Sequence, residues 1–97
     1  MLSERYYVYI MTNKNNRVLY IGMTNNMARR MAEHKNGVTD GFTRRYNIHK
    51  LIYFEEYAHP QEAIKREKSI KNFSREKKMN LIKQRNPSFE EIFYPLL

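Results

Sequence analysis

The 97-residue sequence predicts a single α/β domain, residues 1–97, with a small three-stranded antiparallel sheet flanked by helices in the order β-β-α-β-α-α. Three observations support this fold class. Residues 6–11 and 17–22 are rich in aromatic and β-branched side chains and flank an asparagine cluster, which predicts a hairpin. A third segment of this kind, 49–57, follows a polar loop at 38–47. The remaining stretches carry helix start and stop signals.

Three helices are expected. The first, 24–36, begins with a threonine cap at Thr24 and ends before Gly37. The second, 60–72, begins with a proline, which suits the first turn of a helix. The third, 74–84, begins with a serine cap, and the following Asn-Pro pair predicts a last short helix or turn.

Composition excludes several classes of function. The chain has no cysteine, which rules out disulfides, zinc–thiolate sites and a cysteine nucleophile. The longest uncharged apolar run, 6–11, is far too short to span a bilayer, and the N-terminus lacks the apolar stretch of a signal peptide. We therefore expect a cytoplasmic protein that does not enter the membrane.

The positive charge is concentrated in one part of the chain. Residues 65–85 carry nine Lys or Arg and two Glu, a net charge of +7 against +8 for the whole chain. A concentrated basic stretch attracts phosphate polyanions, because each phosphate contact releases condensed counterions. A solvated helical face on a basic protein explains the same pattern, and charge alone does not separate the two. An anionic membrane surface is the weaker third option, since no strong apolar stripe accompanies the charge.

The predicted hairpin places two tyrosines together. Strand alternation puts Tyr9 and Tyr20 on the same sheet face as near neighbours. Tyrosines also pack in ordinary cores, so their pairing alone does not indicate function. Gly22 at the end of the second strand either leaves room for a group to approach the backbone or serves as a turn residue.

The first helix has polar residues beside its apolar stripe. Met27 and Met31 share a face, with His34 about 20° and Arg30 about 60° from Met27 on the helical wheel. Arg29 points the opposite way, into solvent. A structural histidine with satisfied hydrogen bonds and a surface arginine are the simpler interpretations. A functional site is the alternative.

The second helix has a carboxylate in the middle of its apolar face. Glu67 lies within about 40° of Ala63 and Ile70 on the wheel. Such a carboxylate must pair, shift its pKa or hold a metal ion. An internal salt bridge to a lysine such as Lys71 is the structural alternative to a metal ligand.

The order and spacing of these residues resemble the GIY-YIG nucleases, in particular their small stand-alone bacterial single-domain members. Tyr7-Val8-Tyr9 and Tyr20-Ile21-Gly22 are similar to the two half-motifs that name the family, with Tyr9 and Tyr20 eleven positions apart. Arg30 follows Tyr20 by ten residues, and His34 follows Arg30 by four. Residues 63–71 resemble the segment around the family's metal-binding glutamate, here Glu67.

Two positions depart from the pattern. Tyr7 replaces the first glycine of the first half-motif, and Met23 stands where the repair-type relatives have a lysine. The help of that lysine is missing here. Neither change removes the set of two tyrosines, arginine, histidine and glutamate.

The resemblance implies a metal-dependent nuclease that hydrolyses phosphodiester bonds. Tyr9, with assistance from His34, would take a proton from the attacking water, and Tyr20 would position the reacting groups. Arg30 would stabilise the developing negative charge on the phosphate. Glu67 would hold Mg²⁺ or Mn²⁺, hard cations that prefer oxygen ligands and keep several waters.

The expected partner is nucleic acid, DNA before RNA, and the sequence does not indicate the oligomeric state. Lys71, Lys77 and Lys78 are expected to contact the phosphate backbone, and Asn86 lies where the family often has a late asparagine. A non-catalytic nucleic-acid-binding module of the same fold is the alternative function. A basic protein–protein adaptor is a third interpretation.

Overall fold

The structure, a computed structural model, describes residues 4–37 and 41–94. Its elements are β1 (Tyr6–Thr12), β2 (Leu19–Thr24), α1 (Met27–Lys35), α2 (Gly41–Arg45), β3 (Lys50–Tyr57), α3 (Pro60–Lys71) and α4 (Arg75–Arg85). The predicted three-stranded antiparallel sheet flanked by helices is confirmed, with its elements in the predicted order. The addition is α2, a five-residue helix inside the segment expected to be a polar loop.

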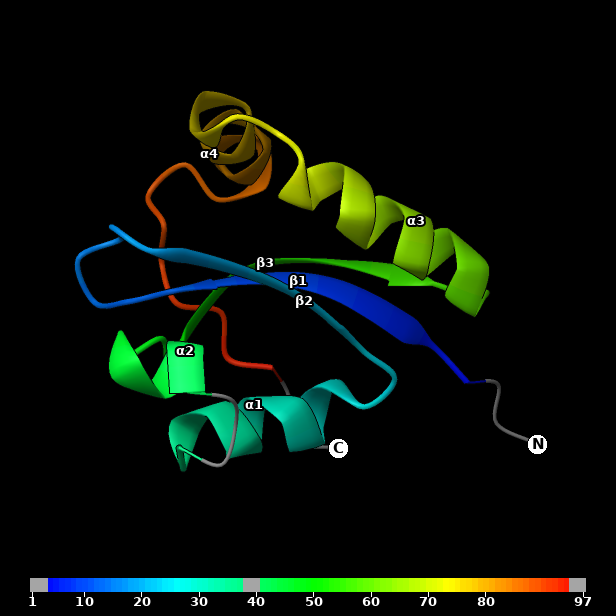
Figure 1. Cartoon of the computed structure of the whole chain (residues 1–97), viewed down its shortest axis with the longest axis horizontal. Helices are drawn as coiled ribbons and strands as arrows, with labels where there is room; N and C mark the ends of the chain where they lie inside the picture. The colour runs from blue at the N-terminus through cyan, green and yellow to red at the C-terminus, as the bar shows by residue number, and fades with distance from the viewer. Residues whose placement is uncertain (1–3, 38–40, 95–97) are drawn as a thin grey trace.

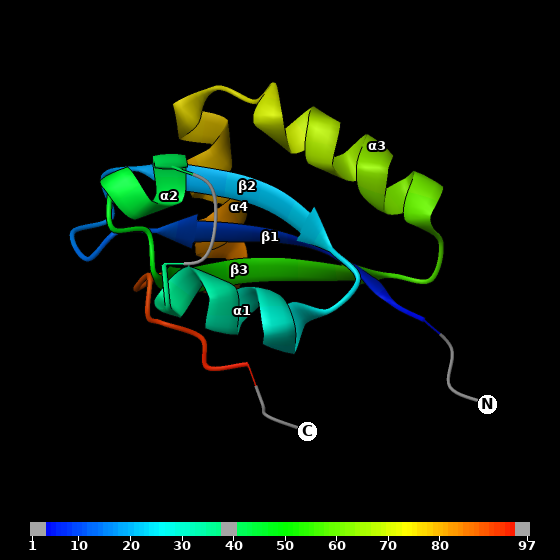
Figure 2. The ribbon, with the colours of Figure 1, turned by 60° about the horizontal axis from the view of Figure 1, so that its bottom comes forward.

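The sheet separates two layers of helices. The strand order is β2-β1-β3, with β1 in the centre and antiparallel to both neighbours. Helices α1 and α2 lie on one face, whereas α3 and α4 lie on the other (Figure 1). Figure 2 shows that α3 runs on the side of the sheet where β2 is the edge strand. No helix in the described ranges is long and apolar enough to cross a membrane.

Each sheet face has its own hydrophobic core. The core under α3 and α4 consists of Val8, Ile10, Ile21, Ile52, Tyr53, Ala63, Ile70, Ile82 and Phe89. The core on the α1 side consists of Tyr9, Met11, Met27, Met31, Ile48 and Leu51. The alternation of β1 residues between the two cores follows from the two-residue period of a strand. The α1 face is therefore the one that receives the tyrosines of the hairpin.

The first helix begins later than predicted. Asn26 is its N-cap, and the side chain of Asn26 accepts a hydrogen bond from the backbone N–H of Arg29 at 3.0 Å. Thr24 instead ends β2, and its hydroxyl accepts the backbone N–H of Asn26 at 3.1 Å. Both are good capping residue types, so the sequence pattern did not distinguish them. Gly37 follows the helix with φ +70°, as its predicted terminating role requires.

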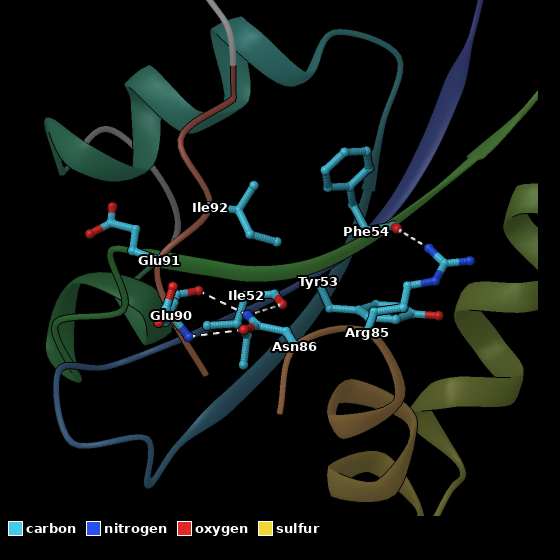
Figure 3. A pocket seen from close by; sticks show the side chains of 8 residues that line it. All are labelled: Ile52, Tyr53, Phe54, Arg85, Asn86, Glu90, Glu91 and Ile92. Carbon is cyan, nitrogen blue, oxygen red and sulfur yellow. Dashed lines mark hydrogen bonds between the residues drawn. The ribbon is translucent and has the colours of Figure 1, made fainter. Parts of the chain in front are cut away.

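The C-terminal segment 86–94 covers the outer edge of β3. The backbone N–H of Ile92 donates to the carbonyl of Leu51 at 2.8 Å, and the amide of Asn86 donates to the carbonyl of Ile52 at 2.9 Å. Figure 3 shows Asn86 beside Ile52 and Arg85 reaching the carbonyl of Phe54. These contacts satisfy edge carbonyls that would otherwise be open to another strand. A cavity of about 360 Å³ lies between this segment and the strand.

Candidate active site

The hairpin stacks two tyrosines over a glycine. Tyr9 pairs with Gly22 across the β1–β2 ladder, and the ring centroids of Tyr9 and Tyr20 are 6.2 Å apart. A Cβ atom at Gly22 would lie only 2.6 Å from Cζ and the hydroxyl oxygen of Tyr9, and 3.0 Å from Tyr20. The absence of a side chain at Gly22 therefore lets both rings lie against the strand. The predicted proximity of the two tyrosines is confirmed.

Helix α1 brings a histidine to this pair. The hydroxyl of Tyr9 and Nε2 of His34 are 3.2 Å apart, a hydrogen-bonding distance. The ring of Tyr20 meets that of His34 edge-on, with centroids 5.6 Å apart. Tyr9 and His34 are each only 1% exposed, while Tyr20 is partly exposed. Tyr20 therefore lies between the buried pair and solvent, and these three residues form the tyrosine–histidine cluster.

Arg30 lies one helical turn before His34 at the border of the buried face. Its side chain is 35% exposed, and NH1 is 3.7 Å from the carboxylate of Glu33. Its Nε is buried and has no hydrogen-bond partner among the described residues. Arg29 is exposed, so the predicted difference between the two arginines is confirmed. The guanidinium of Arg30 is thus held by one long ion pair and keeps donor capacity for an anion.

Glu67 comes from the other side of the sheet. Ala63 and Ile70 of α3 are buried in the core opposite α1, and Glu67 lies between them in sequence. Its carboxylate is 3.3 Å from Nζ of Lys71, the salt bridge that was the structural alternative. The five residues therefore do not approach one another from a single face of the sheet. Figures 1 and 2 show α3, which carries Glu67, on the face of the sheet opposite α1, which carries His34.

Comparison with known proteins identifies the family. The sequence pattern of the GIY-YIG catalytic domain matches residues 5–80. The chain belongs to the GIY-YIG family. This family consists of nucleases that act on nucleic acid and generally use a divalent metal ion.

Small proteins named UPF0213 resemble the whole domain. The chain is 40% identical over 80 residues to a UPF0213 protein of Clostridium perfringens, a match that covers 82% of this chain and 85% of the relative. It is 38% identical to a UPF0213 protein of Staphylococcus haemolyticus, a match that covers 84% of this chain and 98% of the relative. The solution NMR structure of the UPF0213 protein of Bacillus halodurans superposes with a TM-score of 0.58 at 29% identity, covering 89% and 90%.

The metal that the family generally uses has one candidate ligand among the predicted residues. No group of three or more His, Cys, Asp or Glu in the described ranges is arranged to hold an ion. The side chain of Glu67 is 20% exposed and that of Lys71 53% exposed. An ion pair of this helical spacing, with its lysine exposed, contributes only about 0.3–0.5 kcal/mol, so a hydrated cation can compete with the lysine. The carboxylate therefore fits a hard ion that keeps most of its waters.

The predicted nucleic-acid contacts lie on α3, α4 and the segment after them. Lys77 is exposed, with Nζ 4.0 Å from the ring centroid of Phe73, while Lys78 is partly buried. Lys71 pairs with Glu67. The side chain of Asn86 bonds to the carbonyls of Ile52 and Glu90 and to the N–H of Glu90. These bonds give Asn86 a structural role, and its contact with nucleic acid stays a prediction.

A buried carboxylate on β3 was not predicted from the sequence. Glu55 is 8% exposed and accepts two hydrogen bonds from Arg66, each of 2.9 Å, together with the hydroxyls of Tyr53 and Tyr57. Burial raises the pKa of Glu55, but the hydrogen bonds from Arg66 and the tyrosines outweigh it and lower the pKa to about 2. Burial and the Glu55 charge raise the pKa of each tyrosine to about 12. The spacing of two tyrosines around one glutamate in a strand was the available signal.

An aromatic pair, one residue on α2 and one directly after it, was also missed. Phe42 and Tyr46 are exposed, and their ring centroids are 4.9 Å apart. Phe42 also lies 6.4 Å from the ring of Tyr20, which connects the pair to the tyrosine–histidine cluster. The four-residue spacing of the two aromatics was the signal for a helical face. Treating 38–47 as a loop concealed it.

Proposed function

We propose that this chain is a metal-dependent nuclease that hydrolyses phosphodiester bonds, with DNA as its first substrate class and RNA as the second. Membership of a nuclease family supports phosphodiester hydrolysis. The assignment of roles to residues rests on the hydrogen-bonding distance between Tyr9 and His34, at the centre of the tyrosine–histidine cluster.

That contact addresses a difficulty of tyrosine chemistry. A tyrosine with an ordinary pKa of about 10 is a poor base at neutral pH, whereas histidine with a pKa of about 6.5 is a suitable one. In the tautomer with the proton on Nδ1, His34 accepts the hydroxyl proton of Tyr9 at Nε2. Tyr9 can then take a proton from the attacking water as its own proton passes to His34. No free tyrosinate has to accumulate.

Arg30 and Glu67 complete the proposed site. The guanidinium of Arg30 stabilises the negative charge that develops on the phosphate oxygens, because its donors are only weakly engaged by Glu33. Glu67 would hold the divalent cation, and the cation would supply charge neutralisation for the phosphate. Tyr20, at the boundary between the buried pair and solvent, positions the water or the phosphate.

A non-catalytic nucleic-acid-binding module is the second candidate function. Two observations favour it: Tyr9 and His34 are almost completely buried, and Glu67 is paired with Lys71 on the other layer. In this case the Tyr9–His34 contact stabilises the core, and the basic helices α3 and α4 bind phosphate. The two candidates make opposite predictions for cleavage.

The test is incubation of the purified chain with plasmid, single-stranded DNA and structured RNA, in Mg²⁺, in Mn²⁺ and in chelator. We expect cleavage that needs the ion. Glu67→Gln should abolish cleavage and leave nucleic-acid affinity within a few-fold, while Tyr9→Phe removes the proton relay and keeps the ring packing. Binding without cleavage by the wild-type chain on all substrates would favour the binding module. Cleavage by Glu67→Gln at the wild-type rate would exclude Glu67 as the metal ligand.

A further inference from the structure

We propose that Phe42 on α2 and Tyr46, which directly follows this helix, form a stacking site for an unpaired base, and that the substrate is therefore single-stranded or locally unpaired at the bound nucleotide. The inference deepens the proposed function, on which it rests for the location of the reacting phosphate. We call these two residues, with Arg44 and Arg45, the α2 platform.

The platform presents aromatic rings to solvent. Phe42 is 46% exposed and Tyr46 40% exposed. Phe42 lies on α2, whose buried residue is Thr43, and Tyr46 follows the helix directly, with its backbone N–H donating to the carbonyl of Phe42 at 3.1 Å. The two rings are one helical turn apart, with centroids 4.9 Å apart and an interplanar angle of 51°. The backbone N–H of Ile48 donates to the carbonyl of Thr43 at 2.9 Å, and Ile48 is itself buried in the core on the α1 side, which holds the end of the helix against that core. The rings are thus exposed on a fixed element.

The platform continues into the tyrosine–histidine cluster. The ring centroids of Phe42 and Tyr20 are 6.4 Å apart, with an interplanar angle of 31°. The ring centroids of Tyr20 and His34 are 5.6 Å apart. A series of aromatic contacts therefore runs from the buried histidine to the exposed Tyr46. A base and the phosphate of the same nucleotide are joined through one sugar. A base on the exposed rings would hold its phosphate close to Tyr20.

The charge around the rings fits a nucleotide rather than an apolar peptide. Helix α2 has the sequence Gly-Phe-Thr-Arg-Arg, with two arginines and no acid. Arg44 and Arg45 are exposed, and the guanidinium carbon of Arg45 is 5.6 Å from the centroid of the Tyr46 ring. Aromatic rings interleaved with arginines are the combination that binds single-stranded nucleic acid, with bases on the rings and phosphates on the cations.

Stacking on a side chain requires a free base face. In a duplex each base face is covered by its neighbours, so exposed rings gain little from it. An unpaired base in a single strand, loop or end can be turned out onto Phe42 or Tyr46. The platform is therefore specific for unpaired nucleotides and tolerant of base identity, since every base has an aromatic face.

The test compares two probes with the same phosphates. Fluorescence anisotropy in chelator measures the affinity for a short labelled oligothymidylate and for an abasic oligomer of equal length. The wild-type chain should bind the oligothymidylate more tightly. Phe42→Ala with Tyr46→Ala should lose roughly 5- to 100-fold in affinity for the oligothymidylate, the usual effect of removing stacking, and much less for the abasic oligomer.

Matched variants separate stacking from general damage. Phe93→Ala removes another exposed aromatic, 75% exposed on the C-terminal segment, and should change neither affinity. Phe42→Trp keeps a stacking surface and should retain the preference, and circular dichroism checks the fold of each variant. Equal affinity of the wild-type chain for the two probes, tighter binding of duplex than of single strand, or an equal loss in Phe93→Ala would overturn the proposal.

These measurements distinguish this proposal from the catalytic one. Binding is measured in chelator, so a chain that binds unpaired bases through α2 but never cuts nucleic acid supports the platform and refutes the proposed nuclease activity. A chain that cuts nucleic acid with unchanged probe affinities in the double variant supports the nuclease and refutes the platform.

Discussion

Substituting Gly22 with alanine should disturb the candidate site more than any other single methyl group. The new Cβ would lie 2.6 Å from two atoms at the tip of the Tyr9 ring and 3.0 Å from the ring of Tyr20. Ordinary contact begins near 3.4 Å, so the tip of Tyr9 must move by about 0.8 Å or more. A shift of this size can carry the 3.2 Å contact between Tyr9 and His34 beyond hydrogen-bonding distance.

The cost follows from the burial of the ring. Tyr9 is 1% exposed in a packed core, so its ring has no solvent into which it can turn. Overpacking of this kind typically costs about 1–3 kcal/mol. For a chain of this size each kcal/mol lowers the melting temperature by roughly 4–8 °C, which gives an expected decrease of about 4–24 °C. Any nuclease activity should fall as well, since the contact between Tyr9 and His34, the proposed proton relay, is displaced.

Thermal unfolding followed by circular dichroism measures the stability change, and a matched glycine provides the control. None of the described residues lies within 4 Å of a Cβ built at Gly41, so Gly41→Ala should melt at or slightly above the wild-type temperature. Adding Tyr9→Leu to Gly22→Ala removes the atoms that clash. The destabilisation of the double variant should therefore be less than the sum of the two single effects.

Melting of Gly22→Ala at the wild-type temperature, or simple addition of the effects of Gly22→Ala and Tyr9→Leu, would contradict this prediction. Either result would mean that the ring of Tyr9 does not lie across the backbone of Gly22 in solution. The proposed proton relay would then lose the contact on which it depends.

Three further predictions concern charged residues. Arg30→Ala should lower the cleavage rate by about two or more orders of magnitude, and Arg29→Ala much less; equal losses in a cleavage assay would contradict the assignment. Replacing Lys77 and Lys78 with alanine should reduce the slope of log binding constant against log salt concentration by up to about two units. An unchanged slope would place the binding surface elsewhere. The pKa of Glu55 is lowered to about 2, so its stabilisation, up to about 3 kcal/mol, is present above pH 4.5 and lost as the pH falls toward 2. The free energy of unfolding of Glu55→Gln should therefore not show this loss between pH 4.5 and 2. An acid transition unchanged from the wild type would contradict the prediction.

The sequence could predict the tyrosine–histidine cluster because each step is local. Strand alternation fixes which face Tyr9 and Tyr20 share, and the helical period fixes His34 on the buried stripe with Met27 and Met31. The helix that follows the hairpin packs its buried stripe on the sheet face that carries Tyr9 and Met11. Two local periods and one short connection are enough to bring these side chains together.

The irregular pairing of β3 with β1, and the tail that covers the outer edge of β3, could not be predicted in the same way. The register shifts between Ile10 and Met11, which pair with Tyr53 and Leu51, so Ile52 has no partner on β1. This irregularity places two consecutive β3 residues in the same core. No local period indicates a bulge, and the tail that covers this edge is fixed by long-range hydrogen bonds. The Asn86-Pro87 pair could therefore predict only a last short helix or turn at this end of the chain.

For Glu67, a helical wheel predicts the neighbours on the helix but not the position of the helix relative to the sheet. The wheel correctly places Glu67 between Ala63 and Ile70, but it does not tell which face of the sheet those apolar residues cover. That choice depends on how the chain crosses from β3 into α3. The histidine and the glutamate reach the sheet from opposite layers, and β2 is the edge strand on the α3 side. A phosphate that contacts both must therefore lie across the β2 edge. Under the two proposals above, one strand of nucleic acid at that edge would contact Phe42 and Tyr46 on one face and the lysines of α3 and α4 on the other.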